Sequence, residues 1–224
     1  MTRPHDMGGR FGDGAVVPEG EDERFHAEWH PRALALTLAC GTLGLWNIDV
    51  SRHARERLAP KDYARFAYYE KWIAALADLL VDQGALSADE LAKGQANSVS
   101  PLAAKRLSAG DVASVLAKGG PADRPGGPAP RFAVGDTVRL RAHAENTKVP
   151  GGHTRLPSYA AGAIGCILRH HGTHVLPDSS AHRLGDAPEP LYAVALKACD
   201  LWAHPEHPDD DVVVDLWDSY LERV

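Results

Sequence analysis

Two arginines lie in segments whose composition sets them apart as candidate functional positions. Arg52 comes directly after the apolar segment 46–51, where a short turn is expected. Arg155 lies in the loop 151–157, GGHTRLP, whose glycines permit a close backbone approach and whose proline stiffens the exit. A guanidinium stays charged at any working pH and donates paired hydrogen bonds to anionic oxygen atoms. Composition by itself is also typical of a solvated charge at a helix end and of an ordinary turn, so both interpretations stay open.

Other residue types that perform catalysis are arranged less favourably. Asp49, Ser51 and His53 are the residue types of a hydrolase triad, but triad members meet in space rather than at neighbouring positions. The chain contains no G-x-S-x-G, no P-loop and no G-x-G-x-x-G motif. A nucleophile elbow and the usual phosphate-binding loops therefore have no support in the sequence.

Histidines cluster in two places, which raises the question of a metal site. His170, His171 and His174 fall within one segment, and His204 and His207 fall within another. Adjacent residues of a strand point to opposite faces, so His170 and His171 are poorly placed to bind one metal ion. No nearby cysteine or carboxylate completes a set of ligands. The pattern favours structural hydrogen bonds, for instance at a subunit interface.

The elements that position these residues are helical in the first half of the chain. One helix is expected within 25–46, and a second is expected to begin near Pro60 and to end at Gly84. The apolar stripe of the second helix consists of Tyr69, Trp72, Ile73, Leu76 and Leu80. Two shorter helices are expected to follow. One is opened by the capping box of residues 87–90, and the other covers 108–118.

Beyond residue 130 the apolar period changes from that of a helix to that of a strand. Val138 and Leu140 alternate with polar residues. A similar alternation involves Tyr192, Val194 and Leu196. Further short strands are expected at 164–168, 174–176 and 212–216. Short strands separated by glycine, proline and aspartate are typical of a small antiparallel barrel.

The domain organisation follows from the segment 119–130, GGPADRPGGPAP, in which glycine and proline are too dense for a helix or a strand to persist. We interpret this segment as a linker. Residues 1–118 then form an all-helical N-terminal domain with an extended N-terminal arm, and residues 131–224 form a small antiparallel β-barrel. The fold class expected from the sequence is α+β.

The composition is that of a globular protein with protein or small-molecule partners. A net charge of −6 argues against nucleic acid, because polyanion binding needs a basic surface. No apolar run reaches about 18 residues and the N-terminus has no signal-peptide pattern, so no membrane span and a cytoplasmic location are expected. Cys40, Cys166 and Cys199 are far apart, which predicts reduced and mostly buried thiols.

Nine motifs, distributed over almost the whole chain, resemble the nitrile hydratase β subunit family. They are HDMGG (5–9), FHAEWHPRALALTLA (25–39), GLWNIDVSRHARE (44–56), YYEKW (68–72), RFAVGDTVRLR (131–141), GHTRLPSY (152–159), RHHGTHVLPD (169–178), LGDAPEPLYAV (184–194) and DLWDSYLE (215–222). A single motif of this kind is weak, but nine in the family's order make coincidence implausible.

The resemblance implies an SH3-like C-terminal barrel and a separate α subunit, with which the chain forms an αβ heterodimer or an α2β2 heterotetramer. In this family the α subunit holds cobalt or iron through the cluster C-[ST]-L-C-S-C and backbone amide nitrogens, and two of those cysteines are oxidised. This chain has no such cluster, so no metal is expected on it. The implied activity is hydration of a nitrile to its amide, a lyase reaction that needs both subunits.

The resemblance also implies roles for five residues. By motif, Arg52 and Arg155 correspond to the two family arginines that donate hydrogen bonds to the oxidised cysteines of the α subunit. Ile48, Tyr68 and Trp72 correspond to residues that line the nitrile pocket from the β side. An alternative interpretation places these three side chains in the helical core instead.

The chain departs from the family pattern near Arg155. Where the family often has R-Y-x-R-G, residues 158–162 are SYAAG, and the stretch 141–150 is longer than the turn expected before GHTR. Two other functions stay open as alternatives. One is a metallochaperone-like activator, although such proteins generally lack part of this length. The other is a thiocyanate hydrolase component, in which the β-like sequence is usually divided between two chains.

Overall fold

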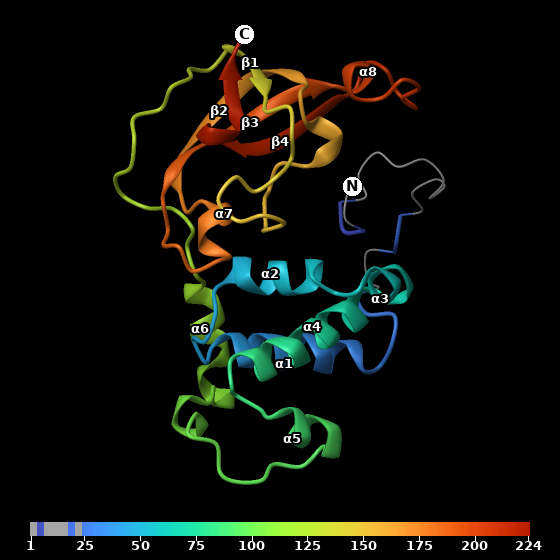
Figure 1. Ribbon diagram of the computed structural model, residues 1–224, viewed down its shortest axis with the longest axis vertical. Coiled ribbons are helices and arrows are strands. Elements are labelled where there is room, and N and C mark those ends of the chain that lie inside the picture. Colours follow the sequence, from blue (N-terminus) through green and yellow to red (C-terminus); the bar gives the residue numbers. More distant parts are fainter. Residues whose placement is uncertain (1–3, 7–17, 21–23) are drawn as a thin grey trace. The chain divides into compact units, whose positions relative to one another are not determined.

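A computed structural model describes residues 4–6, 18–20 and 24–224 of the chain (Figure 1). These residues belong to two compact units, one that includes Gly12–Gly120 and one that includes Pro121–Val224. Most of the expected N-terminal arm lies outside the described residues, and of the motif at 5–9 only His5 and Asp6 are described.

Among the described residues of the first unit, the regular secondary structure is helical. Its α-helices are α1 (His30–Gly41), α2 (Ile48–Glu56), α3 (Pro60–Arg65), α4 (Tyr68–Asp82), α5 (Ala88–Lys93) and α6 (Val112–Lys118). Short 3-10 turns lie at Ala103–Lys105 and Ala109–Asp111. The capping box before α5 is confirmed, because the Ser87 hydroxyl accepts a hydrogen bond from the Glu90 amide and the Glu90 carboxylate accepts one from the Ser87 amide.

The segment around Arg52 is a helix, so the expectation of a short turn there was wrong. The side chain of Asn47 caps α2 by accepting hydrogen bonds from the amides of Asp49, at 3.0 Å, and Val50, at 2.9 Å. Asn is among the best N-cap residues, and Asp49 adds a negative charge in the first turn. These two signals start the helix at Ile48, inside the segment 46–51 after which a turn was expected.

The single long helix expected from Pro60 to Gly84 is in fact two helices. The backbone is extended at Phe66, with ψ of 134°, which ends α3. The Glu70 carboxylate then accepts a hydrogen bond from the Ala67 amide at 2.7 Å and starts α4. Pro60 opens α3 as expected, and Gly84 follows α4 in the left-handed region, with φ of +66°.

The core of the helical unit is small. The helix α4 packs against both α1 and α2 (Figure 1). Ala54, Ala75 and Leu79 are buried together, with Trp46 and Val50 among the partly buried residues that cover them. By contrast, α1 buries Ala33 but leaves Leu36 and Leu38 exposed. None of the described helices is long and apolar enough to cross a membrane.

The second unit is built on one antiparallel sheet of five strands in the order β4-β3-β2-β1-β5. The strands are β1 (Thr137–Leu140), β2 (Ile164–His174), β3 (Glu189–Lys197), β4 (Asp211–Trp217) and β5 (Leu221–Arg223). The edge strands β4 and β5 do not pair with each other within the described residues, so this sheet is open. Short helices α7 (Pro177–Ser180) and α8 (Ala198–Leu201) follow β2 and β3.

Two expectations about the strands need correction. The separate strand expected at 174–176 is the end of β2, which stops at His174 because Pro177 opens α7 soon afterwards. In addition, the sequence did not predict β5, because this strand has only three residues and pairs with β1, which is distant in the sequence.

The prediction that the cysteines are mostly buried was wrong, because Cys166 and Cys199 are exposed. For Cys166 the reason is the alternation along β2, which turns its side chain away from the core.

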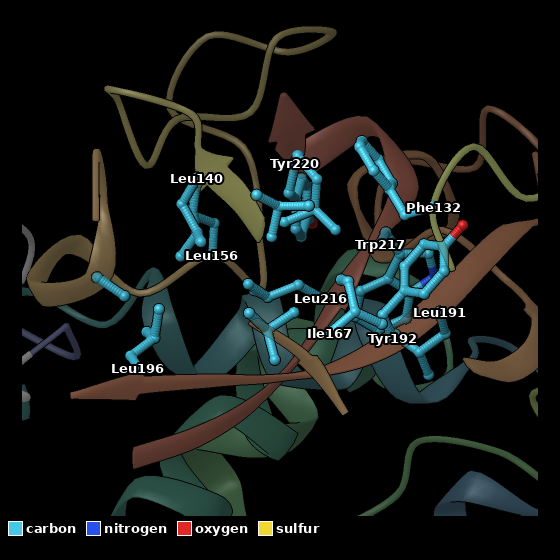
Figure 2. Close-up of a cluster of buried hydrophobic side chains, with 14 of the residues drawn as sticks. Phe132, Leu140, Leu156, Ile167, Leu191, Tyr192, Leu196, Leu216, Trp217 and Tyr220 are labelled. Carbon is cyan, nitrogen blue, oxygen red and sulfur yellow. The ribbon is translucent and has the colours of Figure 1, made fainter. Parts of the chain in front are cut away.

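The core of the sheet unit is large and well packed (Figure 2). Its fully buried members include Val138, Leu140, Leu156, Ile167, Tyr192, Val194, Leu196, Leu216, Tyr220 and Leu221. The paired strands approach closely at Gly165, where an added Cβ would lie 2.7 Å from the carbonyl oxygen of Ala195. The alternation of Val138 and Leu140 predicted from the sequence is confirmed, as both are fully buried while Thr137 and Arg139 are exposed.

Candidate functional site

Arg52 is anchored within its own helix. Its Nη1 atom donates a hydrogen bond to Oδ1 of Asp49 at 2.9 Å, one turn earlier in α2. The Asp49 side chain is only 6% exposed, whereas that of Arg52 is 36% exposed. The ion pair therefore holds one side of the guanidinium and leaves its other N–H groups without a hydrogen-bond partner in the part of the chain that the structure describes.

This pairing also removes the triad interpretation. The carboxylate of Asp49 is directed to Arg52, and Nδ1 of His53 lies 3.6 Å from the carboxylate of Glu56. Asp49 and His53 therefore serve different neighbours on the helix. Since a triad needs its histidine to be oriented by the aspartate, this set is not arranged for nucleophilic catalysis.

Ile48, Tyr68 and Trp72 come from the start of α2 and from the first turns of α4. Ile48 is 60% exposed and Tyr68 is 63% exposed, so the interpretation that places them in the helical core is wrong for these two. Trp72 is partly buried, and its ring centroid lies 5.4 Å from that of Tyr68. The result is an apolar and aromatic surface rather than a packed interior.

Arg155 is held by its backbone rather than by its side chain. Its amide donates a hydrogen bond to the hydroxyl oxygen of Tyr220 at 3.2 Å, and the hydroxyl of Thr154 donates to the same oxygen at 3.2 Å. The Tyr220 hydroxyl in turn donates to Oδ1 of Asp178. The Arg155 side chain is exposed and makes no hydrogen bond or ion pair with the described residues. The guanidinium of Arg155 is thus exposed to solvent, while the backbone that carries it is held in place.

Asn146 fixes the other side of the Arg155 loop. The buried Asn146 amide nitrogen donates to the carbonyl oxygens of His153, at 2.6 Å, and Asp178, at 2.9 Å. Its amide oxygen accepts from the backbone of Lys148 and Val149 at 2.8 and 3.0 Å. This explains why the stretch 141–150 is longer than a simple turn: it carries the residue that braces the loop.

Gly152, the second residue of this loop, is required by close packing. A Cβ on Gly152 would lie 2.5 Å from Nε2 of His182 and 2.8 Å from Nδ2 of Asn146. The same His182 nitrogen accepts a hydrogen bond from the His153 amide at 2.9 Å. Any larger side chain at Gly152 would therefore displace two of the groups that shape the Arg155 loop.

Burial dominates the electrostatics around Tyr220. Burial raises the pKa of the Asp178 carboxyl, although the Tyr220 hydrogen bond and the Arg141 charge lower it in part. The pKa of Tyr220 is raised well above its usual range by burial and by the neighbouring Asp178. The hydroxyl therefore remains a donor at neutral pH, and the loop contact persists. Asn146, Asp178, Tyr220 and His182 had no signal in the sequence that linked them to Arg155, because they are joined only by the fold.

Two histidines of β2, His170 and His171, have structural partners. Nε2 of His171 lies 3.0 Å from Oδ1 of Asp215, and the ring of His170 packs against that of Tyr192 with centroids 5.2 Å apart. Among the described residues, no group of three or more histidine, cysteine, aspartate or glutamate side chains is placed to hold a metal ion. The side chains of His170 and His171 thus have different neighbours, in line with the alternation expected along a strand.

The fold and the site together define a class: an α+β protein that presents arginine donors and an aromatic surface without, in its described part, a ligand set for a metal. Comparison with known proteins gives the family. The family models described as nitrile hydratase β subunit, N-terminal and C-terminal, match residues 1–115 and 121–223. The chain belongs to the nitrile hydratase β subunit family.

Relatives match the chain along almost its whole length. The low-molecular-weight cobalt-containing nitrile hydratase subunit β of Rhodococcus rhodochrous is 32% identical over 227 residues, covering 99% of each chain. The nitrile hydratase subunit β of Pseudomonas putida is 36% identical over 223 residues, again covering 99% of each chain. The cobalt-containing subunit of Pseudonocardia thermophila is 31% identical over 231 residues, covering 100% of this chain and 97% of the relative.

Proposed function

We propose that this chain is the β subunit of an enzyme that hydrates a nitrile to the corresponding amide, and that it acts only together with a metal-bearing α subunit. The observation that carries this proposal is the match to both halves of the family over nearly the full chain. We further propose the domain limits expected from the sequence, with a helical domain at 1–118, a linker at 119–130 and an SH3-like barrel at 131–224.

The role proposed for Arg52 and Arg155 is to donate hydrogen bonds to the oxidised cysteines of the α subunit. Sulfenate and sulfinate oxygens are compact anionic acceptors that are costly to leave unpaired in a partly desolvated cleft. The planar guanidinium donates two parallel hydrogen bonds to such groups. Support comes from the way both residues are presented, since Arg52 is fixed by Asp49 and Arg155 by its backbone while donors remain available.

The substrate is proposed to meet this chain at Ile48, Tyr68 and Trp72. The exposed Ile48 and Tyr68 and the partly buried Trp72 offer the apolar surface that the carbon tail of a nitrile requires. The metal, when bound on the α subunit, polarises the nitrile as a Lewis acid. The contribution of this chain is to bind and orient the tail and to exclude water from it.

Cobalt is the metal we propose for the complex, because two of the relatives are named as cobalt-containing. Iron is the alternative, and the choice depends on the α-subunit motif. A cytoplasmic location and an αβ or α2β2 assembly stay predictions. Purification of the chain with its α subunit, followed by metal analysis and measurement of the mass of the complex, tests the metal and the assembly together.

The arginine roles are tested by Arg52→Lys and Arg155→Lys in the reconstituted complex. Breaking a buried charge-assisted pair costs about 2–5 kcal/mol, so the rate of nitrile hydration is expected to fall by at least about thirtyfold for each variant. Arg57→Lys and Arg139→Lys are matched controls, because both arginines are exposed. Near-wild-type activity of the Arg52 or Arg155 variant would contradict the role proposed for that arginine. Assays with thiocyanate, and a search for cobalt transfer without hydration, test the two alternative functions.

A further inference from the structure

Arg55 lies next to the proposed substrate surface of Ile48, Tyr68 and Trp72. Along α2, Ile48, Arg52 and Arg55 are spaced by four and then three residues, which places them on one face of the helix. The guanidinium carbon of Arg55 lies 4.6 Å from the centroid of the Trp72 ring. Trp72 is in turn in ring contact with Tyr68. Arg55 is therefore a second positive group, besides Arg52, that borders the apolar surface.

The charge of Arg55 lacks the counter-ion that its neighbours have. Arg52 pairs with Asp49 at 2.9 Å, and Arg57 pairs with Asp82 at 3.3 Å. The guanidinium of Arg55 makes no hydrogen bond or ion pair with any residue that the structure describes, although the side chain is partly buried. Its favourable contact is the stacking on Trp72.

The surroundings make this unpaired charge costly. Burial lowers the pKa of Arg55, and the positive charge of Arg52 acts in the same direction, whereas Tyr68, Glu56 and Tyr63 act against it. Arginine nevertheless stays protonated in proteins. A partly desolvated cation beside a second cation is stabilised when an anion completes the site. The stacked guanidinium uses its face on Trp72, so the N–H groups along its edge are the donors left for that anion.

We propose that Arg55 makes this enzyme favour nitriles that carry a carboxylate at the end remote from the C≡N group. The carboxylate accepts hydrogen bonds from the edge of the Arg55 guanidinium while the carbon chain lies along Trp72 and Tyr68. This inference rests on the proposed function, because it takes the surface of Ile48, Tyr68 and Trp72 as the place where the nitrile tail binds. It adds a substrate class and a residue that selects it.

The test uses the αβ complex with two nitriles of similar size, 4-cyanobenzoate and the uncharged 4-methylbenzonitrile. In Arg55→Met, kcat/KM for 4-cyanobenzoate is expected to fall by about tenfold or more, mainly through KM, because a charge-assisted hydrogen bond is lost. The value for 4-methylbenzonitrile is expected to stay the same. Arg55→Lys keeps the charge and is expected to retain most of the activity on the carboxylate. Arg57→Met is the matched control, since Arg57 is exposed.

Each other outcome overturns the inference in a recognisable way. Equal losses for both nitriles would mean that Arg55 only supports the packing of Trp72. Loss of the α subunit from Arg55→Met during gel filtration would mean that its counter-ion is a carboxylate of the partner. No change for either nitrile would remove Arg55 from the site. Failure of the wild-type complex to hydrate any nitrile would refute the proposed function itself, which is a different result.

Discussion

The two arginine regions of this chain are stabilised in opposite ways. Arg52 is held by Asp49, three residues earlier in the same helix, and the helix itself is started by Asn47 just before. Arg155 is held through Tyr220, which is 65 residues away, and its loop is braced by Asn146 and Asp178. The first arrangement is local and partly exposed, whereas the second is non-local and buried. The local one tolerates damage elsewhere in the fold better than the non-local one.

The cores of the two units also differ, since the sheet unit buries more and larger side chains than the helical unit. The sheet unit packs large side chains such as Leu140, Ile167 and Leu216 at 1% exposure or less. The helical unit buries mainly small residues, and it leaves Trp29 and Leu36 at 42% and 48% exposure. A helix with so much exposed apolar surface is typical of a subunit that completes its core against a partner. The sheet unit thus buries a large apolar core within itself, whereas the helical unit leaves large apolar side chains at and before α1 exposed.

The largest expected effect is on the core of the sheet unit. Leu216→Ala removes a fully buried side chain and leaves a cavity, so the free energy of unfolding is expected to fall by about 2–5 kcal/mol. Leu36→Ala is the matched control in the helical unit, where the side chain is exposed and the expected change is within about 0.5 kcal/mol. Urea unfolding of the isolated chain measures both. Equal losses would show that the contrast between the two cores is wrong.

The next largest effect is expected at Tyr220. Tyr220→Phe removes one donor and one acceptor, which leaves Asp178, Thr154 and the Arg155 amide without this partner. Leaving buried groups unpaired costs about 1–3 kcal/mol of folding stability. The rate of the αβ complex is expected to fall as well, because Tyr220 is a positioning residue for Arg155. Tyr192→Phe is the control. The hydroxyl of Tyr192 donates a hydrogen bond to Asp218, so this variant should lose stability without a matching loss of rate.

The free energy of unfolding is expected to depend on pH through the buried Tyr192 of the sheet unit. Burial and the hydrogen bond to Asp218 raise the pKa of Tyr192 from 10 to about 12. Because the folded-state pKa is raised, the stabilisation is fully present below pH 10 and is lost as pH rises towards 12. The unfolding free energy of the wild type should therefore fall more steeply than that of Tyr192→Phe over this interval. Parallel curves in urea titrations at several pH values would argue against the shifted pKa.

The smallest effect is expected where the anchoring is local. Asp49→Asn breaks the ion pair with Arg52 and removes a charge from the first turn of α2. Pairs of this kind contribute about 1 kcal/mol or less, so the helical unit should remain folded. The complex should keep most of its activity, because Arg52 can still reach its acceptor from an intact helix. A loss as large as that of Tyr220→Phe would mean that local anchoring matters as much as the buried network.

Much of the fold could be predicted from residues that act over short distances. The capping box of Ser87 and Glu90, the stop at Gly84 and the alternation around Val138 each rest on neighbours within a few positions. The failures have equally definite causes. The cap at Asn47 was masked by an apolar run, and the break at Phe66 depends on Glu70 starting a new helix. The roles of the candidate site residues were predicted from the motifs, because composition alone left the interpretation of Arg52 and Arg155 open.

The sequence by itself determined the α+β class, the family and the identity of Arg52 and Arg155 as candidates, because periodicity, composition and motif order are written along the chain. Only the tertiary structure decided that Ile48 and Tyr68 are exposed, that Asn146 and Tyr220 hold the loop of Arg155, and that Arg55 lies on Trp72. The physical reason is that burial and hydrogen bonding between distant segments arise from chain folding. No local pattern encodes them.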